Sequence, residues 1–450
     1  MRLATAAVLI IAALVCGALA SWEHSVASTD GGHRVAVRTP LWSPRRIPGP
    51  IVGAADQQRT TPSAQHLQTA LDADVARYGN SCFVVTKGSH VLASHDADTP
   101  LIPASTQKLL TAAAGLEKLG SSFRYETKAV AVAPAGSTTL DRLWLVGSGD
   151  PVIATAEGLD PSSPGVATRL ETLADAIVAG GIRQIDEVDG DDSRYDTQRF
   201  LPSWPSSYRS DFDITPMGAL NVNHSSAIIG GKVVETDDPA TFAASVLTRL
   251  LRARGVTVTA NPGHSSAPAL AAPIASVRSQ PLSTIVAWMF KTSDNLTAEL
   301  LTKELGVRVS QPGTTAAGVD VIRSTLRSLG VSLDSQTMID GSGLDRGNRL
   351  TCRILAAVVR LGTRPALQVL QAGLPVAPAS FDGRVHAKGG YLTDVTGLAG
   401  TVSGADTLTF SFLANGGVPV KARFDLVQFA AVLGAYQPPA LLSETVVSLP

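Results

Sequence analysis

The spacing of apolar residues divides the chain into helical and strand-like stretches. Apolar side chains recur at helical spacing over residues 62–78, and two strand-like runs follow at 81–85 and 91–94, separated by a Lys-Gly-Ser turn. A second helical run begins near Ser105 and closes at Gly120. The first part of the folded chain is therefore predicted to contain a helix, a β-hairpin and a second helix.

Beyond Gly120 the pattern becomes strand-like. Short apolar runs alternate with turns rich in Gly, Pro, Asp and Ser as far as Pro268, with one helix predicted over 167–180. The remaining predicted elements are strands over 127–132, 140–146, 385–388, 398–403 and 408–414 and helices over 281–306, 313–330, 351–362 and 424–436. This order predicts an α+β fold in which an insert interrupts the main domain.

The chain of 450 residues is long enough for two or three domains. The expected parts are a signal peptide or membrane anchor at 1–20, a flexible Pro-rich linker at 21–62, a main domain in two segments at 63–127 and 276–450, and a β-rich inserted region at 128–275 that could hold two subdomains. The linker is predicted because prolines cluster there without a sustained apolar period.

The N-terminus has the features of an export signal. A basic residue, Arg2, precedes an uncharged stretch that ends in a small-residue Ala-Leu-Ala pattern at 18–20. The stretch is about 18 residues long, near the lower limit for a spanning helix, so an uncleaved anchor is the alternative. Lipidation of Cys16 is not expected, because Val15 stands where a lipoprotein signal needs a small residue. We expect a protein of the cell envelope, either secreted or attached to the membrane through its N-terminus.

Composition excludes some functions. A net charge of -1 gives no reason to expect nucleic-acid binding. Removal of the leader would leave Cys82 and Cys352, which could form a disulfide or remain two buried thiols, because the sequence does not give their separation. No cysteine or histidine has a partner at metal-ligand spacing, so neither a metal nor another cofactor is expected.

The first chemical motif is Pro-Ala-Ser-Thr-Gln-Lys at 103–108. On a helix, Ser105 and Lys108 would share one face. A lysine whose pKa is lowered by burial can take the serine proton, and the positive end of the helix dipole favours a developing oxyanion. The alternative is a helix cap followed by a solvated lysine. Lys108 is, however, the only lysine in the chain with a serine three residues before it.

Two later motifs supply further polar groups. Ser293 and Asn295 lie at a break between two helical patterns, where they could relay a proton and bind a substrate amide, although a plain helix cap would look the same. Lys388 precedes Gly389 and Gly390 in an extended segment, where small residues let a ligand backbone approach and the lysine could attract a carboxylate. By itself this last motif would be an ordinary turn.

The order of the three motifs resembles that of the serine penicillin-recognising enzymes, with Ser-x-x-Lys, Ser-x-Asn and Lys-Thr-Gly. The closer resemblance is to the class C low-molecular-mass penicillin-binding proteins, the D-alanyl-D-alanine carboxypeptidase/endopeptidase family. It extends from about His66 to the C-terminal strands and includes the segments at 147–151, 293–299, 340–346 and 392–400. It implies a discontinuous transpeptidase-like domain, with an antiparallel sheet flanked by helices, a helical cluster and a long insert between the first two motifs.

The resemblance also implies roles for residues. Ser105 would attack the penultimate D-Ala carbonyl of a peptidoglycan stem peptide, with Lys108 as base, and Ser293 would pass a proton to the departing D-Ala. Asn295 would hold the acyl side chain, Lys388 would bind the terminal carboxylate, and the backbone N–H groups of Ser105 and Tyr391 would form the oxyanion hole. β-Lactams would inhibit by acylating the same serine, and D,D-endopeptidase activity could accompany the carboxypeptidase.

One position departs from the family pattern. Gly389 stands where the family has threonine, and Tyr391 where it commonly has threonine or serine. The missing hydroxyl removes a hydrogen bond to a charged group, worth about 1.5 to 3 kcal/mol. That free energy corresponds to roughly 10- to 150-fold in binding or rate. Tyr391 could supply a substitute hydroxyl or narrow the cleft, and we predict weak carboxypeptidase activity and weak penicillin binding rather than none.

Three functions compete at this point. A D,D-carboxypeptidase leads, a β-lactamase is disfavoured by the family motifs, and a feebly active envelope protein that binds peptidoglycan or partners stays open because of Gly389. A Ser-His-Asp hydrolase is not expected, because the serine at 342 lacks the Gly-x-Ser-x-Gly spacing. The loop at 340–346 is predicted to shape the site without doing chemistry, and His386 to be a supporting residue.

Overall fold

A five-stranded antiparallel sheet carries the main domain in the computed structural model, which describes residues 52–158, 165–229, 232–334, 336–377, 383–404, 406–416 and 428–436. The strands run in the order β13-β14-β15-β1-β2. Their bounds are β1 (Asn80–Lys87), β2 (His90–His95), β13 (Val385–Leu392), β14 (Val395–Val402) and β15 (Leu408–Asn415). Strand β1 pairs along its whole length with β15, so the earliest and latest strands of the chain lie side by side.

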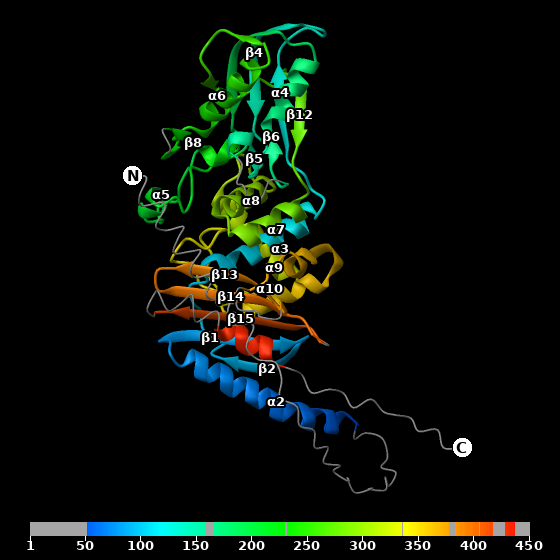
Figure 1. Ribbon diagram of the computed structural model, residues 1–450, viewed down its shortest axis with the longest axis vertical. Helices are drawn as coiled ribbons and strands as arrows, with labels where there is room; N and C mark the ends of the chain where they lie inside the picture. The colour runs from blue at the N-terminus through cyan, green and yellow to red at the C-terminus, as the bar shows by residue number, and fades with distance from the viewer. Residues whose placement is uncertain are drawn as a thin grey trace, which may run out of the picture. The chain divides into compact units, whose positions relative to one another are not determined.

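Helices cover both faces of this sheet (Figure 1). One face packs against α2 (Val52–Val75) and the helical residues 428–435. The other face packs against α10 (Cys352–Arg360). The core that begins there continues into α3 (Lys108–Leu119), α7 (Leu282–Thr292), α8 (Asn295–Val307), α9 (Thr315–Ser328) and the short α11 (Val369–Ala372). Every residue of β14 is buried, as expected of a strand with both faces covered. The predicted α+β class is confirmed.

The first helix begins earlier than the sequence predicted. Helix α2 starts at Val52, inside the segment predicted to be a linker, whereas the apolar spacing predicts a helix only from residue 62. The residues before Pro62 include alanines, glutamines and an arginine, which are good helix formers, so the helix extends through them. The leader and the rest of the linker, residues 1–51, lie outside the described residues, as do residues 424–427 of the predicted last helix. No helix in the described ranges is long and apolar enough to cross a membrane.

The insert contains a mixed six-stranded sheet with the order β10-β7-β4-β3-β12, and β11 also pairs with β7. These strands are β3 (Glu126–Ala131), β4 (Thr139–Val146), β7 (Gln184–Asp191), β10 (Thr257–Val258), β11 (Gly263–His264) and β12 (Ala272–Arg278). The other elements of the insert are β5 (Ile153–Ala154), β6 (Thr168–Arg169), β8 (Ser226–Ile229), β9 (Lys232–Glu235), α4 (Leu170–Ala179), α5 (Ser207–Ser210) and α6 (Pro239–Arg252).

Helix α6 was missed by the sequence reasoning. Its start signals are present, because Asp238 caps the helix by accepting from two backbone N–H groups and Pro239 follows at the first position. The surrounding glycines and prolines had favoured strands and turns. The insert limits at 128 and 275 stay a prediction, and both fall within paired strands, because β3 and β12 run side by side as far as Glu126 and Arg278.

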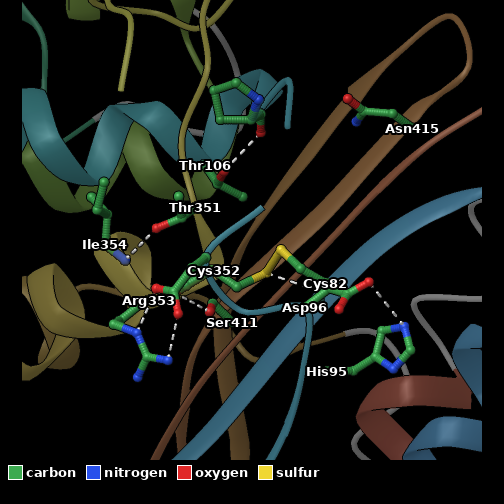
Figure 2. The surroundings of a disulfide bond; sticks show 12 residues. Cys82, His95, Asp96, Thr106, Thr351, Cys352, Arg353, Ile354, Ser411 and Asn415 are labelled. Atoms are coloured by element: carbon green, nitrogen blue, oxygen red, sulfur yellow. Dashed lines mark hydrogen bonds and ion pairs between the residues drawn. A yellow bond between two sulfur atoms is a disulfide. The ribbon is translucent and has the colours of Figure 1, made fainter. Parts of the chain in front are cut away.

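A disulfide joins Cys82 of β1 to Cys352 at the start of α10 (Figure 2). The two Cα atoms are 6.0 Å apart, and both side chains are fully buried. Beside the bridge, the Ser411 hydroxyl of β15 donates to the carbonyl of Cys352 at 2.6 Å (Figure 2). The pairing that the sequence left open is therefore a covalent link between the sheet and the helical layer.

Candidate active site

Ser105 and Lys108 lie where a short 3-10 turn (Ala104–Gln107) leads into α3. The lysine is fully buried, and its Nζ lies 2.9 Å from the serine Oγ. Gly343 passes directly behind the turn, where a Cβ atom would come within 1.9 Å of the carbonyl oxygen of Ala104. The loop at residues 340–346, called the glycine loop below, therefore packs closely against the serine turn.

The Lys108 amine is surrounded by oxygen acceptors. Besides Ser105, its Nζ contacts the Oδ1 of Asn295 at 2.6 Å and the backbone oxygen of Ser342 at 2.8 Å. Burial lowers the pKa of Lys108 from 10.5 to about 8, and the negative charges of Asp294, Asp340 and Glu299 oppose that shift. The amine is therefore unprotonated in about one molecule in ten at pH 7 and in half of the molecules at pH 8.

The second motif is a tight break between two helices. Ser293 ends α7 in the left-handed conformation, at φ 60°, and Asp294 caps α8 by accepting from the backbone N–H of Thr297 at 2.6 Å. This turn directs Asn295 toward Lys108 and leaves Ser293 facing the third motif. A left-handed serine is an uncommon conformation of the kind that collects at functional sites.

The third motif lies on β13, an edge strand of the sheet. Lys388 is almost completely buried, and its Nζ donates to Ser293 Oγ at 2.9 Å and to the Gly389 carbonyl at 2.6 Å. Burial, and secondarily the positive charge of Lys108, hold the pKa of Lys388 well below its usual value. Gly390 permits the strand to approach the serine turn, because a Cβ there would lie 2.9 Å from the backbone nitrogen of Ser105.

The tyrosine of this motif lies over the glycine that replaces the family threonine. A Cβ atom at Gly389 would be 3.4 Å from Cε2 and 3.8 Å from the hydroxyl oxygen of Tyr391. The tyrosine side chain is two-fifths exposed. A tyrosine hydroxyl therefore lies close to the place that a threonine side chain at 389 would fill.

The sequence did not reveal the group that fixes the backbone of Ser342, whose carbonyl oxygen accepts from Lys108 Nζ. The buried Glu299 of α8 accepts through Oε1 from the backbone N–H groups of Gly341 at 3.0 Å and Ser342 at 2.7 Å. Burial raises the pKa of Glu299 to about 8. The available signal was spacing, because Glu299 lies one helical turn after Asn295 and can therefore reach the same side of α8.

The insert also contacts the site directly. The Trp204 indole donates to Asp340 at 3.0 Å, and the Tyr208 hydroxyl donates to the carbonyl of Leu344 at 3.2 Å. The backbone oxygen of Asp213 accepts from the Nδ2 of Asn295 at 2.7 Å. The insert thus supports both the glycine loop and the second motif, which the sequence did not reveal.

The structure brings the candidate residues of all three motifs into one site, linked by hydrogen bonds from Ser105 through Lys108 to Asn295 and from Lys388 to Ser293. Within the described ranges, no group of three or more His, Cys, Asp or Glu side chains is arranged to hold a metal ion. A serine in contact with a buried lysine at the start of a helix is an arrangement typical of serine hydrolases that lack a catalytic histidine.

The comparisons give the family. The sequence matches the D-Ala-D-Ala carboxypeptidase 3 (S13) family over residues 66–233 and 230–433. It is 31% identical over 420 residues to Carboxypeptidase Rv3627c of Mycobacterium tuberculosis, covering 86% of this chain and 87% of that protein. It is 28% identical to a D-alanyl-D-alanine carboxypeptidase of Actinomadura sp., covering 82% and 83% of the two chains. The chain belongs to the D-Ala-D-Ala carboxypeptidase 3 (S13) family.

A solved structure shows the same fold. Penicillin binding protein 4 from Haemophilus influenzae superposes with a TM-score of 0.68 at 20% identity, covering 81% of this chain and 98% of that chain. The resemblance inferred from the motifs is confirmed at the level of family and fold. The protein is accordingly a serine-type D-Ala-D-Ala carboxypeptidase.

Proposed function

We propose that Ser105, Lys108 and Ser293 carry out the hydrolysis of the terminal D-Ala-D-Ala bond of peptidoglycan stem peptides. The observation that carries the proposal is the 2.9 Å contact between Lys108 Nζ and Ser105 Oγ, with the pKa of the buried lysine lowered to about 8. A free amine in contact with a serine hydroxyl is what a general base requires.

The reaction begins when Lys108 takes the proton of the Ser105 hydroxyl and the oxygen attacks the penultimate D-Ala carbonyl. The backbone N–H groups of Ser105 and Tyr391 stabilise the oxyanion. Lys108 then returns its proton through the Ser293 hydroxyl to the departing nitrogen, the C–N bond breaks, and D-alanine leaves an ester on Ser105. Water, activated by the same lysine, hydrolyses the ester and restores the enzyme.

Four residues bind the substrate in this scheme. Asn295 holds the acyl part, and Lys388 binds the terminal carboxylate, whose negative charge would raise the pKa of the buried lysine and favour its charged form. The Tyr391 hydroxyl, lying beside Gly389, takes over part of the role of the family threonine. Because the tyrosine reaches this place from two residues along the strand, its hydrogen bond to the carboxylate is weaker than that of a threonine at position 389. Turnover is therefore slower, and penicillin binding weaker, than with threonine there.

β-Lactams are inhibitors under the same proposal, because their strained amide presents a carbonyl to Ser105 next to a carboxylate for Lys388. The Haemophilus influenzae penicillin binding protein 4, which shares this fold, has been crystallised in complex with a β-lactam. D,D-Endopeptidase activity would require the same attack on a cross-linking bond that follows a D-Ala carbonyl.

We place this reaction outside the cytoplasm. The leader pattern at 1–20 supports export, with either cleavage or an N-terminal membrane attachment, and peptidoglycan lies in the envelope. The proposed division is a peptidase domain at 63–127 and 276–450 and an inserted region at 128–275. A second candidate, a feebly active envelope protein that binds peptidoglycan or partners, is favoured only by Gly389 in place of threonine.

The test is release of D-alanine from a stem pentapeptide ending in D-Ala-D-Ala, by the chain and by its Ser105→Ala variant. Release that disappears in the variant supports both the activity and the nucleophile. Release that persists at the same rate in the variant refutes Ser105 as the nucleophile. No release by the unaltered chain, with peptide binding retained, favours the binding protein.

A further inference from the structure

A cavity that the proposed mechanism does not use is lined by residues of the insert and of the end of α7. Its volume is about 760 Å³, within the range of about 300 to 1,000 Å³ that small-molecule sites occupy. Thr292 and Asp294 line it from the two sides of Ser293 in the sequence. Neither Ser105 nor Lys108 lines it, so the cavity is distinct from the place where the scissile bond would lie.

The wall of the cavity is largely apolar and includes two aromatic rings. Trp288 of α7 and Phe242 of α6 line the cavity and are only partly buried, although each packs against a buried apolar cluster. The indole N–H of Trp288 has no hydrogen-bond acceptor among the described residues. The aliphatic part of the wall is formed by Val152, Ile153, Val166 and Val246. Such rings offer a flat apolar surface to a ligand.

A strained turn of the insert brings polar side chains to the same cavity. Asn223, His224 and Ser225 have left-handed backbones, at φ 53°, 54° and 52°. Residues other than glycine rarely adopt this conformation, and three in succession require support from the surrounding structure. Asn223 supplies support, because its Oδ1 accepts from the Thr155 backbone N–H at 2.8 Å and its Nδ2 donates to the Thr155 hydroxyl at 3.0 Å. The turn places Asn223 and His224 on the cavity wall, and such strain gathers at binding sites.

The charged groups that line the cavity are paired, which limits what can bind. Arg249 Nη1 lies 2.9 Å from Glu157 Oε2. Asp294 Oδ1 accepts from the Thr297 N–H, and Asp294 Oδ2 lies 3.8 Å from His224 Nδ1. A phosphate, a carboxylate or an ammonium group would have to break one of these pairs to find a partner in the cavity wall. The ligand that fits is therefore uncharged, with apolar faces and several hydrogen-bonding groups.

We propose that this cavity binds an uncharged disaccharide of N-acetylated amino sugars, of the kind that forms the glycan strands of peptidoglycan. The choice of this saccharide rests on the proposed function, because the stem peptides are attached to such strands. The C–H faces of the sugar rings pack against Trp288 and Phe242, and the acetamido methyl groups against the aliphatic wall. The hydroxyl and amide groups bond to Asn223 and His224. The site holds the enzyme on the strand whose stem peptides it cleaves.

The test fills the cavity and leaves the three motifs unchanged. Ser245 of α6 is exposed, lines the cavity and donates to the carbonyl three residues before it, so Ser245→Trp should fold. Ser324→Trp is the matched control, because Ser324 of α9 is also exposed and donates to the carbonyl three residues before it, but does not line the cavity. Trp288→Phe keeps a smaller ring in the wall and gives up no hydrogen bond that the described residues make. The probe is N,N′-diacetylchitobiose, and its binding to the full chain and to each variant is measured by titration calorimetry.

We expect the parent and Ser324→Trp to bind the disaccharide equally. Ser245→Trp should bind it about 10- to 100-fold more weakly, because the ligand must displace the new indole ring. Trp288→Phe should bind it about two- to tenfold more weakly, because less ring surface is left for the sugar.

No binding by the parent, or unchanged binding by either cavity variant, would overturn the proposal. A stem pentapeptide that displaced the disaccharide from the Ser105→Ala chain would also overturn it and assign the cavity to the peptide. Failure of the proposed function shows separately, because D-alanine release from the pentapeptide is measured without any saccharide. A parent that binds the disaccharide but releases no D-alanine would retain the saccharide site and lose the proposed function.

Discussion

The lowered pKa of Lys108 makes the rate of acylation dependent on pH in a defined direction. Only the unprotonated amine can take the serine proton, so activity should rise with pH through the pKa of about 8. For a pKa of about 8, the free-base fraction is about 1% at pH 6, about 10% at pH 7 and half at pH 8. The acylation rate constant should therefore rise about tenfold from pH 6 to pH 7, about fivefold from pH 7 to pH 8, and level off above pH 9.

The perturbation that isolates this group is Lys108→Arg. Arginine keeps the positive charge and much of the length, but it cannot lose its proton in this pH range. We expect acylation to fall by about 10²- to 10⁴-fold, the usual contribution of a general base, and to lose its pH dependence. Lys291→Arg is the matched control, because Lys291 is exposed and lies only two residues before Ser293.

The assay is single-turnover acylation by a fluorescent penicillin in excess, followed from pH 6 to pH 9. This measurement separates acylation from hydrolysis of the ester and from product release. A flat profile for the unaltered chain would refute the assignment of Lys108 as the titrating base. An arginine variant that retained the tenfold slope would refute it equally.

Glu299 gives an independent check on the same profile. Its negative charge raises the pKa of Lys108, and Glu299→Gln removes that charge while keeping an oxygen for the two backbone N–H groups of the glycine loop. Because the pKa of Glu299 is itself raised to about 8, its charge acts mainly above pH 8, so the profile of the variant should level off at lower pH while its course below pH 7 stays unchanged. A shift to higher pH would contradict the electrostatic account.

Three further predictions concern other parts of the molecule. Gly389→Thr should raise the rate of penicillin acylation by about tenfold or more by restoring a hydroxyl, and an unchanged or lower rate would count against this account. Burial raises the pKa of Asp150 from 3.8 to about 6, so stability should be lost as pH rises through this window. Asp150→Asn should then exceed the parent in unfolding free energy by about 3 kcal/mol at pH 7. This difference in unfolding free energy between the variant and the parent should disappear below pH 4. An equal difference at pH 7 and below pH 4, measured by denaturant titration, would refute the prediction. Replacing both Cys82 and Cys352 by alanine should lower the free energy of unfolding by about 2 to 5 kcal/mol. The melting temperature is measured for the variant and for the parent with and without reductant. If all three values are equal, the bridge contributes nothing to stability.

The sequence could predict the residues of the three motifs because each motif is local. The Ser105 and Lys108 pair is set by one helical turn, and the break at Ser293 by polar residues between two apolar periods. Contacts such as Trp204 with Asp340 or Asn295 with Asp213 join residues far apart in the chain, and no local spacing encodes them. They depend on how the insert packs, which only the structure shows.

The predicted starts of helices were wrong where one local pattern was given more weight than the residues around it. The apolar spacing predicts a helix from residue 62, whereas the helix begins at Val52, and the capping pair Asp238-Pro239 lies among glycines and prolines that favour strands and turns. The pairing of Cys82 with Cys352 could not be predicted, because it depends on the packing of α10 against β1 across much of the chain.

The order of strands in the main sheet constrains how a newly synthesised chain can become an enzyme. Strand β1 lies between β2 and β15, and Asn80 pairs with Asn415. A chain still emerging from the ribosome has β1 and its neighbour β2 but must wait for β15, and Lys388 is also added long after Ser105. A chain that stops before β15 exposes an unpaired edge of β1, which is a site for aggregation. A chain that lacks β15 is therefore expected to be inactive and prone to self-association.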